Sequence, residues 1–138
     1  MLFLEKEDDS LVFRENGETV MVTPWGSDSL RVTASFLGDI ADDSAALLPQ
    51  AEVQNVTIRI APDGMSGEIT NGKVTAKMSV RAWGNALQIT FVDHTGRVLL
   101  QEVQGGALSL RARYYRALSG GDFYLRASFV SNPEEKIY

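Results

Sequence analysis

Paired carboxylates are the residues of this sequence whose spacing first suggests chemistry. Two carboxylates that flank a glycosidic bond are enough to hydrolyse it, one as the acid and the other as the nucleophile or base. The adjacent pairs are Asp8/Asp9, Asp42/Asp43 and Glu134/Glu135. All three lie in polar or turn-like stretches, and adjacent residues of a strand point to opposite faces. We therefore interpret the pairs as solvated surface charges and assign no catalytic acid and nucleophile among them.

A single histidine and the absence of cysteine limit the remaining chemistry. Without cysteine there is no thiol nucleophile, no thiolate zinc site and no disulfide, and one histidine does not build a His-rich metal site. His94 would have to serve any Ser-His-Asp triad, but it follows Asp93 in a predicted hairpin loop, where we expect a solvated turn residue. Motifs for a phosphate-binding loop, a zinc-protease helix or a serine nucleophile elbow do not occur. We expect no catalytic residue, no metal and no cofactor.

Five aromatic residues could instead bind a sugar. Aromatic rings suit the apolar C–H side of a sugar ring, and Tyr and Trp add a polar group. The same residues at strand ends commonly cover the core, and we favour that interpretation while the other stays open. The five are Trp25, Trp83, Tyr114, Tyr115 and Tyr124.

The elements that would position these residues are strands. Apolar and polar residues alternate with a period of two, and successive strand side chains point to opposite faces of a sheet. One face of each strand is therefore apolar, which is typical of antiparallel sheets packed through one side. The alternating segments are 30–36, 56–60, 74–81, 87–91, 108–113 and 123–129.

The turn-forming residues between these segments agree with a sandwich of short strands. Asn16-Gly17 and Asn71-Gly72 predict tight hairpin turns, and residues 93–96 predict a longer hairpin loop. Residues 62–64 and Gly105-Gly106 are further turns. One or two helical turns are expected at most, over residues 42–48 before Pro49. The fold class predicted is all-β, an antiparallel β-sandwich formed by residues 1–138 as a single domain.

Charge and hydropathy exclude two classes of partner. The net charge is −5, and the densest basic group is Arg111, Arg113 and Arg116, whereas a nucleic-acid-binding domain normally carries a basic patch. We interpret Arg111 and Arg113, two residues apart, as part of a solvated sheet face, and expect no nucleic acid as partner. No run reaches the about 18 apolar residues of a membrane span, so we expect no membrane partner. Residues 1–4 are apolar but acidic residues follow at once, so no signal peptide is evident and a cytoplasmic location is expected.

Several segments resemble the N-terminal domain of family 31 glycoside hydrolases, which include α-glucosidases and α-xylosidases. The C-terminal third carries the resemblance most clearly, and the order and spacing of the segments support it more than any one motif. The segments are DSLRVTASF, NGKVTAKMSV, ALQITFVDHTGRVLL, GRVLLQEVQGG and GGDFYLRASFVSNPEEKIY.

The resemblance implies a galactose-mutarotase-like sandwich that is not itself catalytic. In the family, two aspartates on a following (β/α)8 barrel perform catalysis, and no such barrel is present in this chain. The implied function is that of an N-terminal domain, truncated from a larger α-glycosidase hydrolysing O-glycosyl bonds, which packs on the barrel and helps shape the pocket for a carbohydrate substrate. The chain stops at Ile137-Tyr138 without a polar tail, which fits a cut polypeptide; a natural terminus tucked into the core is the alternative.

The resemblance also implies one substrate-binding residue, Asp122, since some relatives have a sugar-contacting acid at the start of the corresponding strand. Gly120 and Gly121 would let the loop approach a ligand closely. A plain turn aspartate is the alternative interpretation.

Two other functions stay open. A free-standing carbohydrate-binding module would share the sandwich and would need an aromatic platform, for which Trp25 and Trp83 are the candidates. A mutarotase-like enzyme would need a general acid and base in a cleft, and a single histidine in a turn makes this the least favoured of the three.

Overall fold

The computed structural model describes residues 3–15, 17–37, 56–80, 87–103, 112–120 and 123–130. These residues form eleven strands and no helix, and every strand pair is antiparallel. The prediction of an all-β, antiparallel fold is confirmed. The described part of the chain contains no helix, and so no helix long and apolar enough to cross a membrane.

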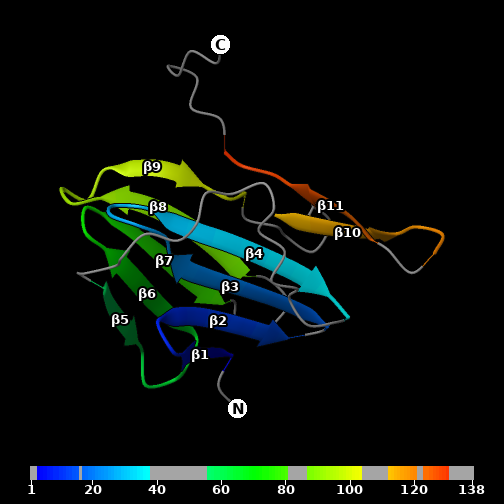
Figure 1. The fold of residues 1–138 in the computed structure, drawn as a ribbon, viewed down its shortest axis with the longest axis horizontal. Coiled ribbons are helices and arrows are strands. Elements are labelled where there is room, and N and C mark those ends of the chain that lie inside the picture. Colours follow the sequence, from blue (N-terminus) through cyan, green and yellow to red (C-terminus); the bar gives the residue numbers. More distant parts are fainter. Residues whose placement is uncertain are drawn as a thin grey trace, which may run out of the picture.

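The strands form two sheets and a separate hairpin (Figure 1). The first sheet has the order β1-β2-β3-β4 and the second the order β5-β6-β7-β8-β9, so each follows the chain as a meander. The strands of the first sheet are β1 (Leu4–Glu7), β2 (Ser10–Glu15), β3 (Glu18–Pro24) and β4 (Leu30–Phe36). Those of the second are β5 (Val56–Ile60), β6 (Ser66–Asn71), β7 (Val74–Val80), β8 (Leu87–Asp93) and β9 (Val98–Gln101).

One hydrophobic core lies between the two sheets. Strands of both sheets contribute alternate residues to it, as Leu11 and Phe13 of β2 do opposite Val22 and Val20 of β3. Met78 of β7, which is 1% exposed, faces them from the second sheet. Burying such side chains stabilises the fold by about 1.5–3 kcal/mol each. The sandwich arrangement predicted from the period of two is therefore present.

The predicted hairpin turns are also found. Glu15 pairs with Glu18 across a two-residue loop in which Gly17 has a φ of 82°. At the second turn Asn71 pairs with Val74, so the loop residues are Gly72 and Lys73, and it is the glycine that takes a positive φ, of 61°. Gly72 is the first of the two loop residues, which is a position where a two-residue hairpin loop needs a positive φ and therefore favours glycine.

The turn at Gly72 also ties the two sheets together through polar groups. The buried Asn71 amide donates from Nδ2 to the carbonyl oxygens of Gly26 and Ser29, at 2.8 and 2.7 Å, in the β3–β4 loop. The Asp28 carboxylate of the same loop accepts the backbone N–H of Lys73 at 2.7 Å. These contacts fix the loop of the first sheet on a turn of the second.

The C-terminal hairpin consists of β10 (Arg113–Ala117) and β11 (Phe123–Ala127) and projects beyond the two sheets (Figure 1). Its base is joined to the end of β9, because Val103 donates to the Ser128 carbonyl at 3.1 Å and Val130 donates to that of Gln101 at 2.8 Å. The end of β10 and the start of β11 lie at the outer end of the hairpin (Figure 1).

Some expectations concern other parts of the chain. The expected helical turns over residues 42–48, the turn at Gly105-Gly106 and most of the alternating segment 108–113 lie outside the described residues. The part of that last segment that is described shows β10 beginning at Arg113 and continuing to Ala117, further along the chain than the alternation predicted.

Candidate functional site

The base of the projecting hairpin holds a buried cluster of charged groups. Arg113, the first residue of β10, has a side chain only 5% exposed. Its Nε donates to Oε2 of Glu18 at 2.9 Å, its Nη1 donates to both carboxylate oxygens of Glu102, and its Nη2 donates to the Leu87 carbonyl at 3.0 Å. One guanidinium therefore joins the hairpin to β3 of the first sheet and to β8 and the end of β9 in the second.

The two carboxylates of this cluster have further partners. Oε1 of Glu102 also accepts the backbone N–H of Ile89 at 2.9 Å. Oε2 of Glu18 accepts the hydroxyl of Tyr115 at 2.7 Å, and the Tyr115 ring stacks on Phe36 with centroids 5.3 Å apart. Within the described residues, no buried side-chain nitrogen or oxygen lacks a hydrogen-bond partner. A cluster satisfied in this way holds its members in one geometry.

Electrostatics fix the protonation of two members of the cluster, Arg113 and Tyr115. Burial acts to lower the pKa of Arg113, but the charges of Glu102 and then Glu18 outweigh it, so that the pKa is raised. The pKa of Tyr115 is also raised, mainly by burial and then by its hydrogen bond to Glu18. Arg113 therefore stays charged and Tyr115 stays protonated at neutral pH. Neither of these two groups exchanges a proton with a substrate near neutrality. Their hydrogen bonds to Glu18 and Glu102 anchor the hairpin to the sheets.

The burial of Arg113 corrects the prediction of a solvated sheet face for this residue. Strand alternation says which residues share a face but does not say what covers that face. Both carboxylates that draw Arg113 inward are distant in sequence from it, Glu18 by 95 residues and Glu102 by 11. No local signal in the sequence pairs these three residues.

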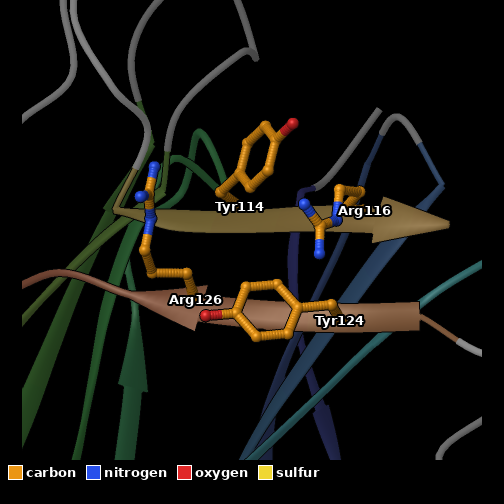
Figure 2. Close-up of a pocket in the computed structure, with 4 residues that line it drawn as sticks. All are labelled: Tyr114, Arg116, Tyr124 and Arg126. Atoms are coloured by element: carbon orange, nitrogen blue, oxygen red, sulfur yellow. The ribbon is translucent and has the colours of Figure 1, made fainter. Parts of the chain in front are cut away.

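The outward face of the same hairpin carries two tyrosines and two arginines, which we call the Tyr–Arg face: Tyr114 and Arg116 of β10 and Tyr124 and Arg126 of β11 (Figure 2). Tyr114 is opposite Arg126 in the register, and Arg116 is opposite Tyr124. Each guanidinium lies over the ring of its partner, at 5.4 and 5.3 Å from the centroid respectively. The four residues line an open hollow of about 520 Å³, and Tyr114 and Tyr124 are 43% and 47% exposed.

A smaller apolar hollow of about 300 Å³ lies beneath the hairpin. It opens between β4 of the first sheet and β8 and β9 of the second, with β11 over it, and the Arg113–Glu102 ion pair forms part of its wall. Its apolar lining consists of Val32, Ala34, Ile89, Phe91, Leu100, Leu125, Ala127 and Phe129.

The structure places only some of the candidate residues. Asp122 and Trp83 lie outside the described residues, as do the pairs Asp42/Asp43 and Glu134/Glu135. His94 is exposed in the β8–β9 loop, as predicted. The third pair, Asp8/Asp9, is exposed in the β1–β2 turn, again as predicted.

The described aromatic residues divide between the two interpretations given to them. Trp25 is partly buried, with the Arg31 guanidinium 4.9 Å from its ring centroid. Tyr115 belongs to the buried cluster, whereas Tyr114 and Tyr124 are exposed. Among the residues that the structure places, no group of three or more His, Asp or Glu side chains could hold a metal ion.

Fold and site together define a β-sandwich domain that carries an anchored, projecting hairpin. No protein-family model matches the chain. Over 148 aligned residues it is 24% identical to "uncharacterized family 31 glucosidase ORF2" of Pseudescherichia vulneris, covering 94% of this chain and 26% of that protein.

The crystal structure of a family 31 α-xylosidase from a soil metagenome, complexed with xylose, superimposes with a TM-score of 0.80 and 30% sequence identity. This similarity covers 95% of the present chain and 21% of the α-xylosidase. The chain is thus a domain related to family 31 glycoside hydrolases, which confirms the resemblance and the galactose-mutarotase-like sandwich that it implied. It spans about a quarter or less of the length of either relative.

Proposed function

We propose that residues 1–138 are the N-terminal, non-catalytic domain of an α-glycosidase that hydrolyses O-glycosyl bonds. The domain packs on a catalytic (β/α)8 barrel of the same polypeptide and helps shape the pocket for a carbohydrate substrate. Support comes from the two relatives, a family 31 glucosidase and a family 31 α-xylosidase, of which the chain spans 26% and 21%. The domain boundaries and the barrel partner are part of the proposal.

The observation that carries the proposal is the anchored hairpin. Asp122 lies in the connection between β10, which ends at Ala117, and β11, which begins at Phe123. A ligand-contacting side chain must be held within about 0.5 Å of its working position, which requires a rigid support. The buried cluster around Arg113 supplies such a support at the base of this hairpin, on β10 itself. We propose that Asp122 contacts the substrate.

The experiment uses the polypeptide encoded by the complete gene. We expect its reading frame to continue past Tyr138 into a barrel, and the product to hydrolyse nitrophenyl α-glucoside or α-xyloside. Asp122→Asn should lower kcat/KM at least about tenfold, a loss of about 1.4 kcal/mol of transition-state stabilisation. Asp9→Asn, in the exposed β1–β2 turn, is the matched control and should leave kcat/KM unchanged.

Two results would contradict the proposal. One is a reading frame that ends at Tyr138. The other is hydrolysis of these substrates by the 138-residue chain alone, since a non-catalytic domain has no turnover of its own. If the larger enzyme is active but Asp122→Asn matches Asp9→Asn, the domain assignment stands and the role of Asp122 is refuted.

The free-standing carbohydrate-binding module is the second candidate, and the exposed rings of Tyr114 and Tyr124 are the observation in its favour. Calorimetric titration of the chain with neutral gluco- and xylo-oligosaccharides separates the two functions. Saturable binding that Tyr124→Ala abolishes would support the module. The Arg116 guanidinium already covers one side of the Tyr124 ring, which leaves less of that ring for a sugar and favours the first candidate.

A further inference from the structure

We propose that the Tyr–Arg face is a docking surface for an acidic surface patch of the same polypeptide, contributed by the part of it that lies outside these 138 residues. This inference rests on the proposed function and deepens it, because it names the face that makes the interdomain contact and the chemistry of its partner.

The first argument is charge. The chain carries a net charge of −5, yet β10 and β11, with the sequences RYYRA and FYLRA, contain no acidic residue. Arg113 is neutralised by Glu18 and Glu102 in the buried cluster. Arg116 and Arg126 form no ion pair with any residue that the structure describes. Two arginines on one face that have no carboxylate partner among the described residues are available to bind carboxylates of another surface.

The second argument is preorganisation. A guanidinium held over an aromatic ring gains about 0.5–1 kcal/mol at an exposed site, and both arginines of the face are held in this way by a directly opposed tyrosine. A guanidinium held beside a ring in this way still has N–H groups that can form a bidentate bond with a carboxylate. Arg and Tyr are also residues that contribute most of the binding energy in protein interfaces.

The third argument is the poor cover of the hairpin. A two-stranded ribbon is marginally stable in water unless something packs against it. Within the described residues this ribbon is secured at its base, while Tyr114 and Tyr124 on one face and Leu125 on the other are each more than 40% exposed. The relatives are about four to five times longer than the segment matched here, so a large part of the polypeptide is available to cover it.

These arguments favour a protein surface over two other occupants. A sugar would have to stack on rings that each already have one side in contact with a guanidinium group. A nucleic acid would be repelled by the net charge of −5. Both become outcomes of the test.

The test compares two charge-reversal variants of the polypeptide encoded by the complete gene. Arg116→Glu/Arg126→Glu changes the face. Arg59→Glu/Arg97→Glu is the matched control, because Arg59 on β5 and Arg97 in the β8–β9 loop are also exposed. Hydrogen exchange of the hairpin amides, followed by mass spectrometry of peptides covering residues 113–127, should be at least about tenfold faster in the face variant and unchanged in the control. The glutamine variant Arg116→Gln/Arg126→Gln keeps the shape but removes the charge and should give an intermediate rate.

The outcomes are distinguishable. The docking surface would be overturned if the hairpin amides exchange at the same rate in the face variant and in the control, and if their exchange in the parent protein is already as fast as in an open ribbon. The proposed function would remain intact in that case. A reading frame that ends at Tyr138 would overturn both. Binding of an oligosaccharide or of single-stranded DNA that Arg116→Gln/Arg126→Gln abolishes would reassign the face. Circular dichroism of both variants must match the parent; if only the glutamine variant folds, its exchange rate decides.

Discussion

Replacement of Arg113 by methionine is expected to lower the free energy of unfolding by about 3–5 kcal/mol. Methionine fills much of the space of the arginine stem, so the change isolates the guanidinium. Without it, the Glu102 and Glu18 side chains, which are 5% and 17% exposed, lose their ionic partner and stay in a place that water barely reaches. An uncompensated buried charge is far more costly than the loss of a surface ion pair.

The assay is urea denaturation of the chain at neutral pH, followed by Trp fluorescence. With a denaturant slope of about 2 kcal/mol per molar, a loss of about 4 kcal/mol moves the midpoint down by about 2 M. Arg116→Met is the matched control, because it makes the same chemical change on the same strand at an exposed site. It should cost only about 1 kcal/mol or less, the contact of Arg116 with the Tyr124 ring.

A double variant tests the physical reason. If an orphaned charge causes the loss, then adding Glu102→Gln to Arg113→Met should recover about 1–3 kcal/mol, because the remaining amide is neutral and still accepts the Ile89 N–H. The reasoning is refuted if Arg113→Met moves the midpoint no further than Arg116→Met does, or if Glu102→Gln makes the single variant worse.

Three further predictions follow from contacts elsewhere. Gly72→Ala should lower the free energy of unfolding by about 1–3 kcal/mol in urea denaturation, because Gly72 has a φ of 61° and a methyl group there would overlap the Asp28 carboxylate. Adding Asp28→Gly should restore part of the lost stability. A denaturation midpoint that Gly72→Ala leaves unchanged would contradict the geometry. Asn71→Ala should cost about 2–4 kcal/mol, because two loop carbonyls lose their buried donor, whereas a cost below that of a surface substitution would rule this out. Hydrogen bonds and charge from Arg14 lower the pKa of Glu7 below its ordinary 4.5, so their contribution is present above that value and is lost as the pH falls through the lowered pKa. Glu7→Gln should therefore cost at most about 1 kcal/mol at neutral pH, since the pair is exposed, and should match the parent midpoint below both pKa values; a difference that persists there would contradict the linkage.

Much of the fold could be predicted because the sequence pattern of a strand is local. The alternation over residues 30–36 and 56–60 matches β4 and β5 at both ends, and the glycines of two turns lie where a positive φ is needed. The exposed position of His94 could be predicted from the turn-forming residues around it. These features depend on neighbours within a few residues, which a single sequence displays.

The candidate site could be predicted only in outline. Tyr124 and Arg126 share a face because they are two residues apart, and the same holds for Tyr114 and Arg116. That the two strands bring each tyrosine opposite an arginine depends on the register of β10 and β11, which the pattern of either strand alone does not determine.

The sequence by itself determined the fold class, the turns and the alternation of faces, because period-two burial and the φ preference of glycine are local properties of the chain. Only the tertiary structure decided that Arg113 is buried and that Arg116, three residues later, is exposed. Glu18 is 95 residues away in sequence from Arg113 and 2.9 Å away in space. A charge enters a protein interior where folding brings its partners to it, and those partners are chosen by sheet packing and not by sequence proximity.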